Sequence, residues 1–244
     1  MCTLSYLLTG NGYELFFNRD EQRSRQIALT PQINRKNQAI YPIDPQGKGT
    51  WLAVNQQGLS LALLNYYQAC DNSKTQSYVS RGQLIPTLML QLKNTQNKFI
   101  GDLLQAIDLS IYQPFQLATF PNNLSKTVEK VNFYQWDGSK LVLTNKEQPF
   151  TSSGVDFDYV EKQRKDKFKQ LICPENATRE QFKNFHSSRE TQGKYSVNME
   201  RFDAKTVSIS HICVAHLLQK IKINFEYYDN INHQLHQQSF IKPV

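Results

Sequence analysis

The 244-residue chain has no long apolar run. None of its hydrophobic stretches approaches the roughly 18 residues that a membrane-spanning helix requires. Its opening, MCTLSYLLTG, carries no basic leader and has too short an apolar core for a signal peptide. We therefore expect a protein without a transmembrane segment that works in the cytoplasm.

Cysteine and histidine are too sparse and too scattered to suggest a metal site. The four cysteines, at positions 2, 70, 173 and 213, form no CxxC pair, so we expect free thiols in a reducing compartment. None of the five histidines shares a helix face with carboxylates at a metal-binding spacing. We predict no metal, and keep a dyad of Cys213 with a flanking histidine, His211 or His216, as a minor alternative.

Nucleic-acid signatures are missing as well, although the net charge is +7. The chain shows no zinc-finger, helix-turn-helix or aromatic-basic pattern, so nucleic acid is not an expected partner. Its densest basic run, residues 162–169, is typical of the solvated face of a helix. A weak attraction for anionic ligands is the alternative interpretation.

The patterns that are present predict strands at both ends of the chain and helices between them. Hydrophobic residues make up 39% of the sequence, which is enough for a core, and neither a repeat nor a long linker divides it. We expect one α+β layered domain over residues 1–244. The expected strands are 2–8, 13–18, 49–54, 59–65, 115–120, 131–136, 140–144, 206–214, 220–228 and 234–240, and the expected helices are 81–92, 98–107, 159–172 and 179–185.

The first predicted hairpin brings a polar cluster to the N-terminus. Residues 9–12, Thr-Gly-Asn-Gly, separate two apolar runs, and Asn-Gly favours a tight turn. We expect residue 2 to begin an edge of the sheet and the returning strand to end where Asn-Arg-Asp-Glu, residues 18–21, begins. The hairpin would then place this cluster beside Cys2.

Cys2 is a candidate nucleophile. Removal of Met1 would leave a thiol and a free α-amine on one residue, and an α-amine titrates near pH ~7.7 to 8.0, close enough to neutrality to accept the thiol proton. Arg19 could lower the pKa of the thiol, and Asp20 could hold the amine. The alternative is a self-contained surface ion pair between Arg19 and Asp20, worth less than about 1 kcal/mol.

Asn65 ends the apolar run LSLALLN and precedes two tyrosines, Tyr66 and Tyr67. An asparagine amide in a cleft can donate to the oxyanion of an acyl-transfer reaction. The alternative for Asn65 is an ordinary turn or capping role. Trp51 lies in a predicted strand, where we expect it to be part of the core rather than to stack on a ligand.

Four motifs stand in order in the first third of the chain: MCTLSYL at residues 1–7, NRDE at 18–21, GTWLAVNQQGLSLALLNYY at 49–67 and SRGQLI at 80–85. Together they resemble the NRDE proteins, also called the transport and Golgi organisation protein 2 family. A weaker match continues with TSSG at residues 151–154 and YSVNMERFDAKTVSIS at 195–210. The resemblance therefore covers nearly the whole chain.

This family is similar in turn to the N-terminal nucleophile (Ntn) hydrolases of the choloylglycine hydrolase and penicillin V acylase type. The resemblance implies a four-layer αββα sandwich. It also implies that Cys2 is the nucleophile and that Arg19 and Asp20 are its electrostatic partners. The run NQQGLSLALLN fits the pattern that precedes an oxyanion-donating asparagine in those enzymes, which assigns that role to Asn65.

The resemblance implies two further residues and shows one difference. Ser152 stands where the hydrolases have the asparagine of a Thr-Asn-Ser triplet, and Arg201 is the candidate for their late arginine. Their early arginine and aspartate are separated by two residues, whereas here Arg19 and Asp20 adjoin. The candidate ligand-binding residues are Asn18, Glu21, Trp51, Tyr66 and Arg201, and for Trp51 ligand binding is the alternative to a core position.

Two functions follow from these residues and the resemblance. The first is a cysteine amidohydrolase that acts on a small acyl-amide or acyl-thioester through an acyl-Cys2 intermediate. The second is a carrier that binds haem, acyl-CoA or lipid in the same cleft without chemistry. No cofactor is expected, and haem is a candidate only as a ligand.

Overall fold

The computed structural model describes residues 1–70, 77–93, 99–128, 130–189 and 193–243. In this part of the chain, sheet A has six strands in the order β10 (Phe150–Ser152), β1 (Cys2–Thr9), β2 (Gly12–Gln22), β11 (Ala204–Leu217), β12 (Lys220–Asp229) and β13 (Gln234–Pro243). Sheet B has seven strands in chain order: β3 (Leu29–Asn34), β4 (Ala39–Ile43), β5 (Leu52–Asn55), β6 (Ser60–Asn65), β7 (Phe115–Phe120), β8 (Asn132–Trp136) and β9 (Leu141–Thr144). All pairings within the two sheets are antiparallel.

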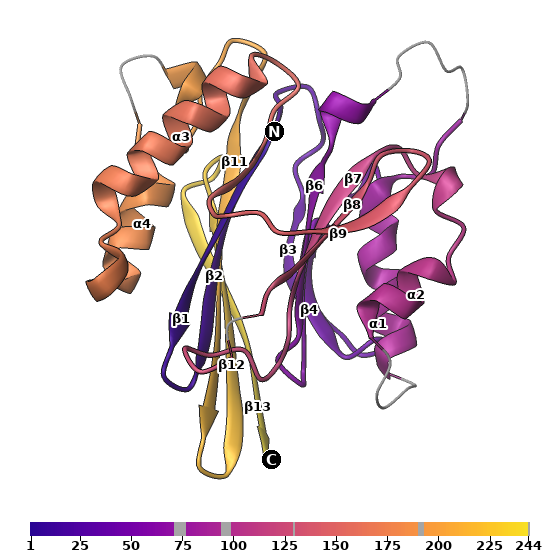
Figure 1. The fold of residues 1–244 in the computed structure, drawn as a ribbon, viewed down its shortest axis with the longest axis vertical. Coiled ribbons are helices and arrows are strands. Elements are labelled where there is room, and N and C mark those ends of the chain that lie inside the picture. Colours follow the sequence, from indigo (N-terminus) through magenta and orange to yellow (C-terminus); the bar gives the residue numbers. More distant parts are fainter. Residues whose placement is uncertain (71–76, 94–98, 129, 190–192, 244) are drawn as a thin grey trace.

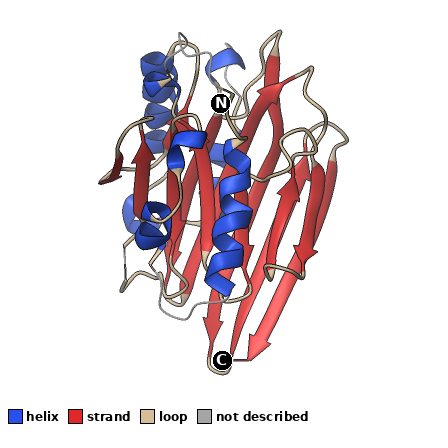
Figure 2. Ribbon diagram, turned by 90° about the vertical axis from the view of Figure 1, so that its right-hand side faces the viewer, coloured by secondary structure: helices blue, strands red, loops and turns tan. Residues whose placement is uncertain are grey.

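The two sheets pack face to face, and helices cover their outer faces (Figure 1). Helices α1 (Leu84–Lys93) and α2 (Ile100–Gln105) pack on sheet B. Helices α3 (Phe157–Leu171) and α4 (Arg179–Ser187) pack on sheet A. Strand β7, FQLATF, is buried at every position because both of its faces are covered. Figure 2 shows the strands running along the long axis, with the two chain ends at opposite ends of the molecule.

The structure confirms the predicted strands and helices, with small shifts at their ends. The predicted helix over residues 98–107 is shorter, and Lys98 lies outside the described residues. Among the described helices, none is long and apolar enough to cross a membrane.

Two predictions about the first hairpin are wrong. Strand β2 does not end before the polar cluster but continues to Gln22, because β11 pairs with it as far as Ala204. Strand β1 is not an edge either, since the short strand β10 pairs with Cys2, Thr3 and Leu4 on its other side. The NRDE residues therefore lie inside a sheet.

The loop predicted between the first two hairpins contains strands β3 and β4. Both carry a proline, Pro31 and Pro42, which weakens the strand signal in the sequence. Strand β3 tolerates its proline because it is an edge strand and its pairing with β4 shifts register between Leu29 and Gln32. Proline is expected at such positions, where no ladder hydrogen bond is lost.

Successive residues of β2 face opposite sides of sheet A. Arg19 lies directly opposite Cys2 on β1, so their side chains share the inner face toward sheet B. Asn18 and Asp20 project to the outer face, under α3 and α4. The NRDE residues thus face both sheet B and the layer of helices α3 and α4.

Asp20 forms a buried ion pair with Arg164 of α3. The distance from Asp20 Oδ2 to Arg164 Nη2 is 3.1 Å, and neither side chain is exposed. Thr206 Oγ1 donates to the other carboxylate oxygen at 2.6 Å, and Arg164 also donates to the Ser196 carbonyl at 2.8 Å. Because the Asp20 backbone N–H donates to the Met1 carbonyl at 3.0 Å, this network holds the strand segment beside Cys2.

Asn18 anchors the C-terminal end of α4 through His186. Its amide donates to the His186 and Val197 carbonyls, each at 2.8 Å, and its Oδ1 lies 2.6 Å from His186 Nδ1. Burial, with the nearby Arg164 charge, lowers the pKa of His186 to about 3, so the ring is neutral at pH 7. Nδ1–H therefore donates to Asn18, and the Ser5 hydroxyl, 2.7 Å away, donates to Nε2.

The first prediction concerns the pH dependence of stability. Protonation of His186 is favoured in the unfolded chain, whose histidine pKa is near 6.5, and is resisted in the folded protein. Its contribution is therefore complete above pH ~6.5 and falls by up to about 1.4 kcal/mol per unit as the pH drops toward 3. Between about pH 6.5 and 5, we expect the free energy of unfolding of His186→Gln, measured with urea, to fall less steeply with decreasing pH than that of the parent protein. Parallel slopes would contradict the assignment.

The second prediction concerns the buried ion pair. Asp20→Asn leaves the Arg164 charge unpaired, and we expect a loss of about 3–5 kcal/mol in the free energy of unfolding. Adding Arg164→Met should recover part of this loss, which a double-mutant cycle measures. The control is Glu200→Gln, which removes exposed ion pairs with Arg23 and Arg189 and should change stability by less than about 1 kcal/mol. Additive single and double variants would contradict the coupling.

Candidate active site

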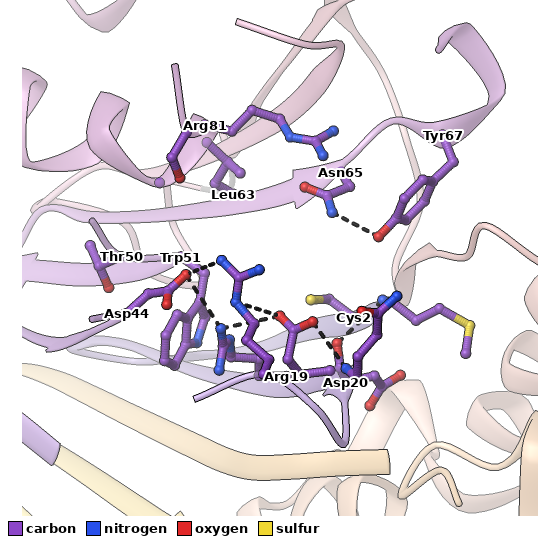
Figure 3. A pocket seen from close by; sticks show the side chains of 16 residues that line it. Cys2, Arg19, Asp20, Asp44, Thr50, Trp51, Leu63, Asn65, Tyr67 and Arg81 are labelled. Atoms are coloured by element: carbon purple, nitrogen blue, oxygen red, sulfur yellow. Dashed lines mark hydrogen bonds and ion pairs between the residues drawn. The ribbon is translucent and has the colours of Figure 1, made fainter. Parts of the chain in front are cut away.

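A cavity of about 300 Å³ lies where the ends of β1, β2 and β6 meet (Figure 3). Sheet A contributes Cys2, Arg19 and Glu21 to its wall, and β6 of sheet B contributes Asn65. Further lining side chains come from the connections between strands: Arg25, Asp44, Thr50, Trp51, Tyr67, Ser80 and Arg81. The cavity therefore gathers most of the residues singled out in the sequence.

Cys2 is the first residue of β1 and is partly buried. It lies directly opposite Arg19 on one side and Ser152 on the other, so all three side chains share the inner face of sheet A. Burial raises the pKa of the Cys2 thiol, whereas the positive charges of the N-terminus and Arg19 act in the opposite direction. The Ser152 hydroxyl is buried and finds no hydrogen-bond partner among the described residues.

Arg19 is held between an aromatic ring and two carboxylates. Its guanidinium carbon lies 4.1 Å from the ring centroid of Trp51, a cation–π contact. Its Nη2 lies 3.1 Å from Glu21 Oε2 and 3.7 Å from Asp44 Oδ2. The alternative of a self-contained Arg19–Asp20 pair is therefore wrong. Trp51 is buried in the core as predicted, and one ring face supports the cavity wall.

Arg25 completes the charge network at this wall. Its Nη2 lies 2.5 Å from Asp44 Oδ2, and its Nε lies 3.5 Å from Glu21 Oε2. Burial alone would raise the pKa of Asp44, but the hydrogen bond from Arg25 and the charges of Arg25 and Arg19 hold it below its usual value. The two arginines and two carboxylates thus neutralise one another.

Two glycines bring the GTW and SRG motifs together. The Thr50 N–H donates to the Gly82 carbonyl at 2.9 Å, and a Cβ on Gly49 would lie only 2.2 Å from the Gly82 carbonyl carbon. This close approach is open only to glycine. It places Arg81 at the cavity, where its Nη1 donates to the Pro114 carbonyl at 2.9 Å.

Asn65 projects from the end of β6 toward Tyr67 (Figure 3). Its Nδ2 donates to the Tyr67 hydroxyl at 2.8 Å, which leaves the second amide hydrogen for a ligand. Tyr67 lines the cavity, whereas Tyr66 is absent from its lining and donates its backbone N–H to the Pro114 carbonyl. The structure thus favours Tyr67 over the expected Tyr66 as a ligand contact.

Asn18, Ser152 and Arg201 are absent from the lining of this cavity, and Asp20 lines it without its carboxylate. Asn18 and the Asp20 carboxylate are on the outer face of sheet A, because neighbouring residues of a strand point to opposite sides. Arg201 lines a neighbouring hollow of about 250 Å³ with Met1 and Glu21. Its Nε donates to Asp203 Oδ1 at 2.8 Å.

The Cys213–histidine dyad is not formed. Both ring nitrogens of His211 face carboxylates instead, with Nε2 2.8 Å from Glu14 Oε2 and Nδ1 3.1 Å from Glu226 Oε2. His216 Nε2 contacts the Asn122 carbonyl. Among the described residues, no group of three or more His, Cys, Asp or Glu side chains is arranged to hold a metal.

Sequence reasoning missed several residues of the cavity, among them Arg25, Asp44, Tyr67 and Arg81. A signal existed for Arg81, which lies in the motif SRGQLI, and for Tyr67, which ends the long motif after Asn65. No local pattern marks Arg25 or Asp44, because they meet only when β2 and β4 are brought together in space.

Comparison with known proteins places the chain in one family. No curated protein matches its sequence. The family model described as Transport and Golgi organisation 2 matches residues 1–233, nearly the full length. The four motifs that resemble this family all fall within the matched range. The chain therefore belongs to the Transport and Golgi organisation 2 family.

Proposed function

We propose that the protein is an Ntn hydrolase-like enzyme that cleaves a small acyl-amide or acyl-thioester through Cys2. The observation that carries this proposal is the position of Cys2, which lines a polar cavity on the same sheet face as Arg19 and Ser152. A nucleophile needs a nearby positive charge and donors for the oxyanion. The cavity supplies residues of both kinds.

The fold supports the same proposal. Two antiparallel sheets lie face to face with helices outside each, an arrangement compatible with the four-layer αββα sandwich that the Ntn resemblance implies. Strand β1 begins with Cys2 inside sheet A, so its backbone is fixed by β10 and β2 on both sides. Removal of Met1 would expose the Cys2 amine at this fixed position.

The proposed reaction has two steps. The free α-amine of Cys2 takes the thiol proton, and the thiolate adds to the substrate carbonyl carbon. Asn65 Nδ2 and the Ser152 hydroxyl donate to the resulting oxyanion, which collapses to acyl-Cys2 as the leaving amine or thiolate takes the proton from the Cys2 ammonium. Water, deprotonated by the same amine, then attacks the acyl-Cys2 carbonyl and releases the acid and the free thiol.

Arg19 has an electrostatic role in this proposal. Its charge faces the same side of the sheet as the thiol and favours the thiolate. Glu21, Asp44 and Trp51 hold its side chain in place. Asp20 acts one step further away, since its carboxylate pairs with Arg164 and so fixes the segment of β2 that pairs with Cys2.

The alternative is a non-catalytic carrier of haem, acyl-CoA or lipid. The lining of the cavity favours the hydrolase, because arginines, carboxylates, an asparagine and hydroxyls make up most of it, whereas haem and lipid need broad apolar walls. The carrier is therefore the outcome to expect only if Cys2 has no chemistry.

The third prediction tests the nucleophile. Cys2→Ala should abolish hydrolysis of phenoxyacetyl amides and fatty acyl thioesters while leaving the melting temperature nearly unchanged, because it removes the attacking sulfur from a partly buried position. The matched control is Cys213→Ala, which removes another partly buried thiol, on β11 and outside the lining of the cavity. Full turnover by Cys2→Ala would overturn the proposal, whereas ligand binding without turnover in the parent would favour the carrier.

The fourth prediction tests the Arg19 charge. Because Arg19 favours the thiolate, Arg19→Gln should move the alkylation of Cys2 by iodoacetamide to higher pH. Peptide mass spectrometry resolves Cys2 from the other thiols, and exposed Cys173 serves as an internal control whose profile should not move. Arg35→Gln, an exposed position in the β3–β4 turn, controls for the loss of charge. Equal profiles for Cys2 in all three proteins would contradict this role.

A further inference from the structure

Arg81 differs from the other two arginines of the cavity in its partners. Arg19 and Arg25 are matched by the carboxylates of Glu21 and Asp44. In the described part of the chain, no carboxylate lies within ion-pair distance of Arg81. The groups that act on it are the Tyr67 phenol and the Cys70 and Cys2 thiols.

Arg81 is partly buried, and none of the described residues supplies a charge partner that would offset its lost hydration. Burial lowers the pKa of the guanidinium from its ordinary value, since the nearby groups do not compensate for lost hydration. Its described backbone contact is the Pro114 carbonyl, which accepts from Nη1. A buried cation is stabilised when an anion with good hydrogen-bond geometry occupies the space beside it.

Tyr67 offers a second donor next to this cation. Its hydroxyl oxygen accepts from Asn65 Nδ2 at 2.8 Å, and no described residue accepts the hydroxyl hydrogen. Burial raises the pKa of the Tyr67 hydroxyl, so the group is protonated at neutral pH and can donate. The Arg81 guanidinium carbon lies 6.0 Å from the Tyr67 ring centroid, so both donors belong to one wall.

This wall lies across the cavity from the nucleophile. Figure 3 shows Arg81, Asn65 and Tyr67 along one side and Cys2 and Arg19 along the other. The space of about 300 Å³ accommodates a small molecule that reaches both walls. A substrate whose carbonyl meets Cys2 can thus present a second polar group to Arg81.

We propose that Arg81 and Tyr67 form a subsite for an anionic oxygen group, a carboxylate or phosphate, carried by the substrate. The subsite deepens the proposed function and rests on it for the identity of the ligand as an acyl substrate. A guanidinium binds either group through paired N–H donors, and the phenol adds a third hydrogen bond. The substrate class is therefore a small acyl-amide or acyl-thioester with a negative charge away from the reacting carbonyl.

Three ligands that share one acyl group and one amide test this subsite. N-phenylacetylglycine carries a carboxylate, N-phenylacetyl-O-phosphoethanolamine carries a phosphate, and N-phenylacetylglycinamide is neutral. Calorimetry on the Cys2→Ala protein measures binding without turnover. We expect at least one anionic ligand to bind about tenfold or more tightly than the neutral one, and the preferred arm distinguishes carboxylate from phosphate. Equal affinities for all three would overturn the proposal.

Substitution of Arg81 identifies the source of the preference. Adding Arg81→Gln should bring the ratio of anionic to neutral affinity close to one, whereas Arg81→Lys should keep part of it because the charge remains. Arg35→Gln, which removes an exposed arginine, should leave the ratio unchanged. A ratio that survives Arg81→Gln would contradict the assignment. If Arg81→Gln does not fold, the proposal is still tested by the affinity ratio of Arg81→Lys and by the comparison of the three ligands on the Cys2→Ala protein.

Turnover by the parent protein separates this inference from the proposed function. Anionic preference in Cys2→Ala, together with no hydrolysis of any of the three ligands by the parent, supports the subsite and counts against the hydrolase. Hydrolysis of the ligands without any preference for the anionic ones supports the hydrolase and overturns the subsite. Preference and hydrolysis together support both.

Discussion

The alternation of side chains along β2 is the constraint on which the site depends. Adjacent residues of a strand cannot face the same side, so Arg19 and Asp20 divide between the cavity and the layer of α3 and α4. Asp20 forms an ion pair with a buried cation, Arg164 of α3. A sequence that appears to be one polar cluster is therefore two interfaces built on one strand.

This division explains why Cys2 is held so firmly. Its own strand is paired on both sides, and the strand beside it is tied to α3 by an ion pair and to α4 through Asn18 and His186. A nucleophile acts efficiently only when its position is fixed before the substrate arrives. The outer residues of NRDE thus contribute to the proposed chemistry by positioning, and the inner residues contribute charge.

Local sequence signals predicted most helices and strands well, but they predicted poorly which strands and side chains meet in space. The Asn-Gly turn located the first hairpin, and helical periodicity located α3 and α4, since each signal lies within a short window. Strands β3 and β4 were missed because each carries a proline, and the proline of β3 is tolerated only through an edge position and a register shift, which depend on the partner strand. Cys2, Arg19 and Asn65 could be identified because motif order points to them, whereas Arg25 and Asp44 meet only through tertiary pairing. The direction of Asp20 required knowing that β2 continues past Asn18.

The central claim is that Cys2 forms a covalent acyl intermediate, and intact mass spectrometry tests it most directly. The purified protein is incubated with acyl thioesters and acyl amides, quenched in acid, and fragmented to locate any adduct. The account predicts a chain that begins at Cys2, without Met1, and carries the acyl group on the Cys2 sulfur. A chain that retains Met1, or an acyl group mapped to another residue while Cys2 stays free, would contradict it.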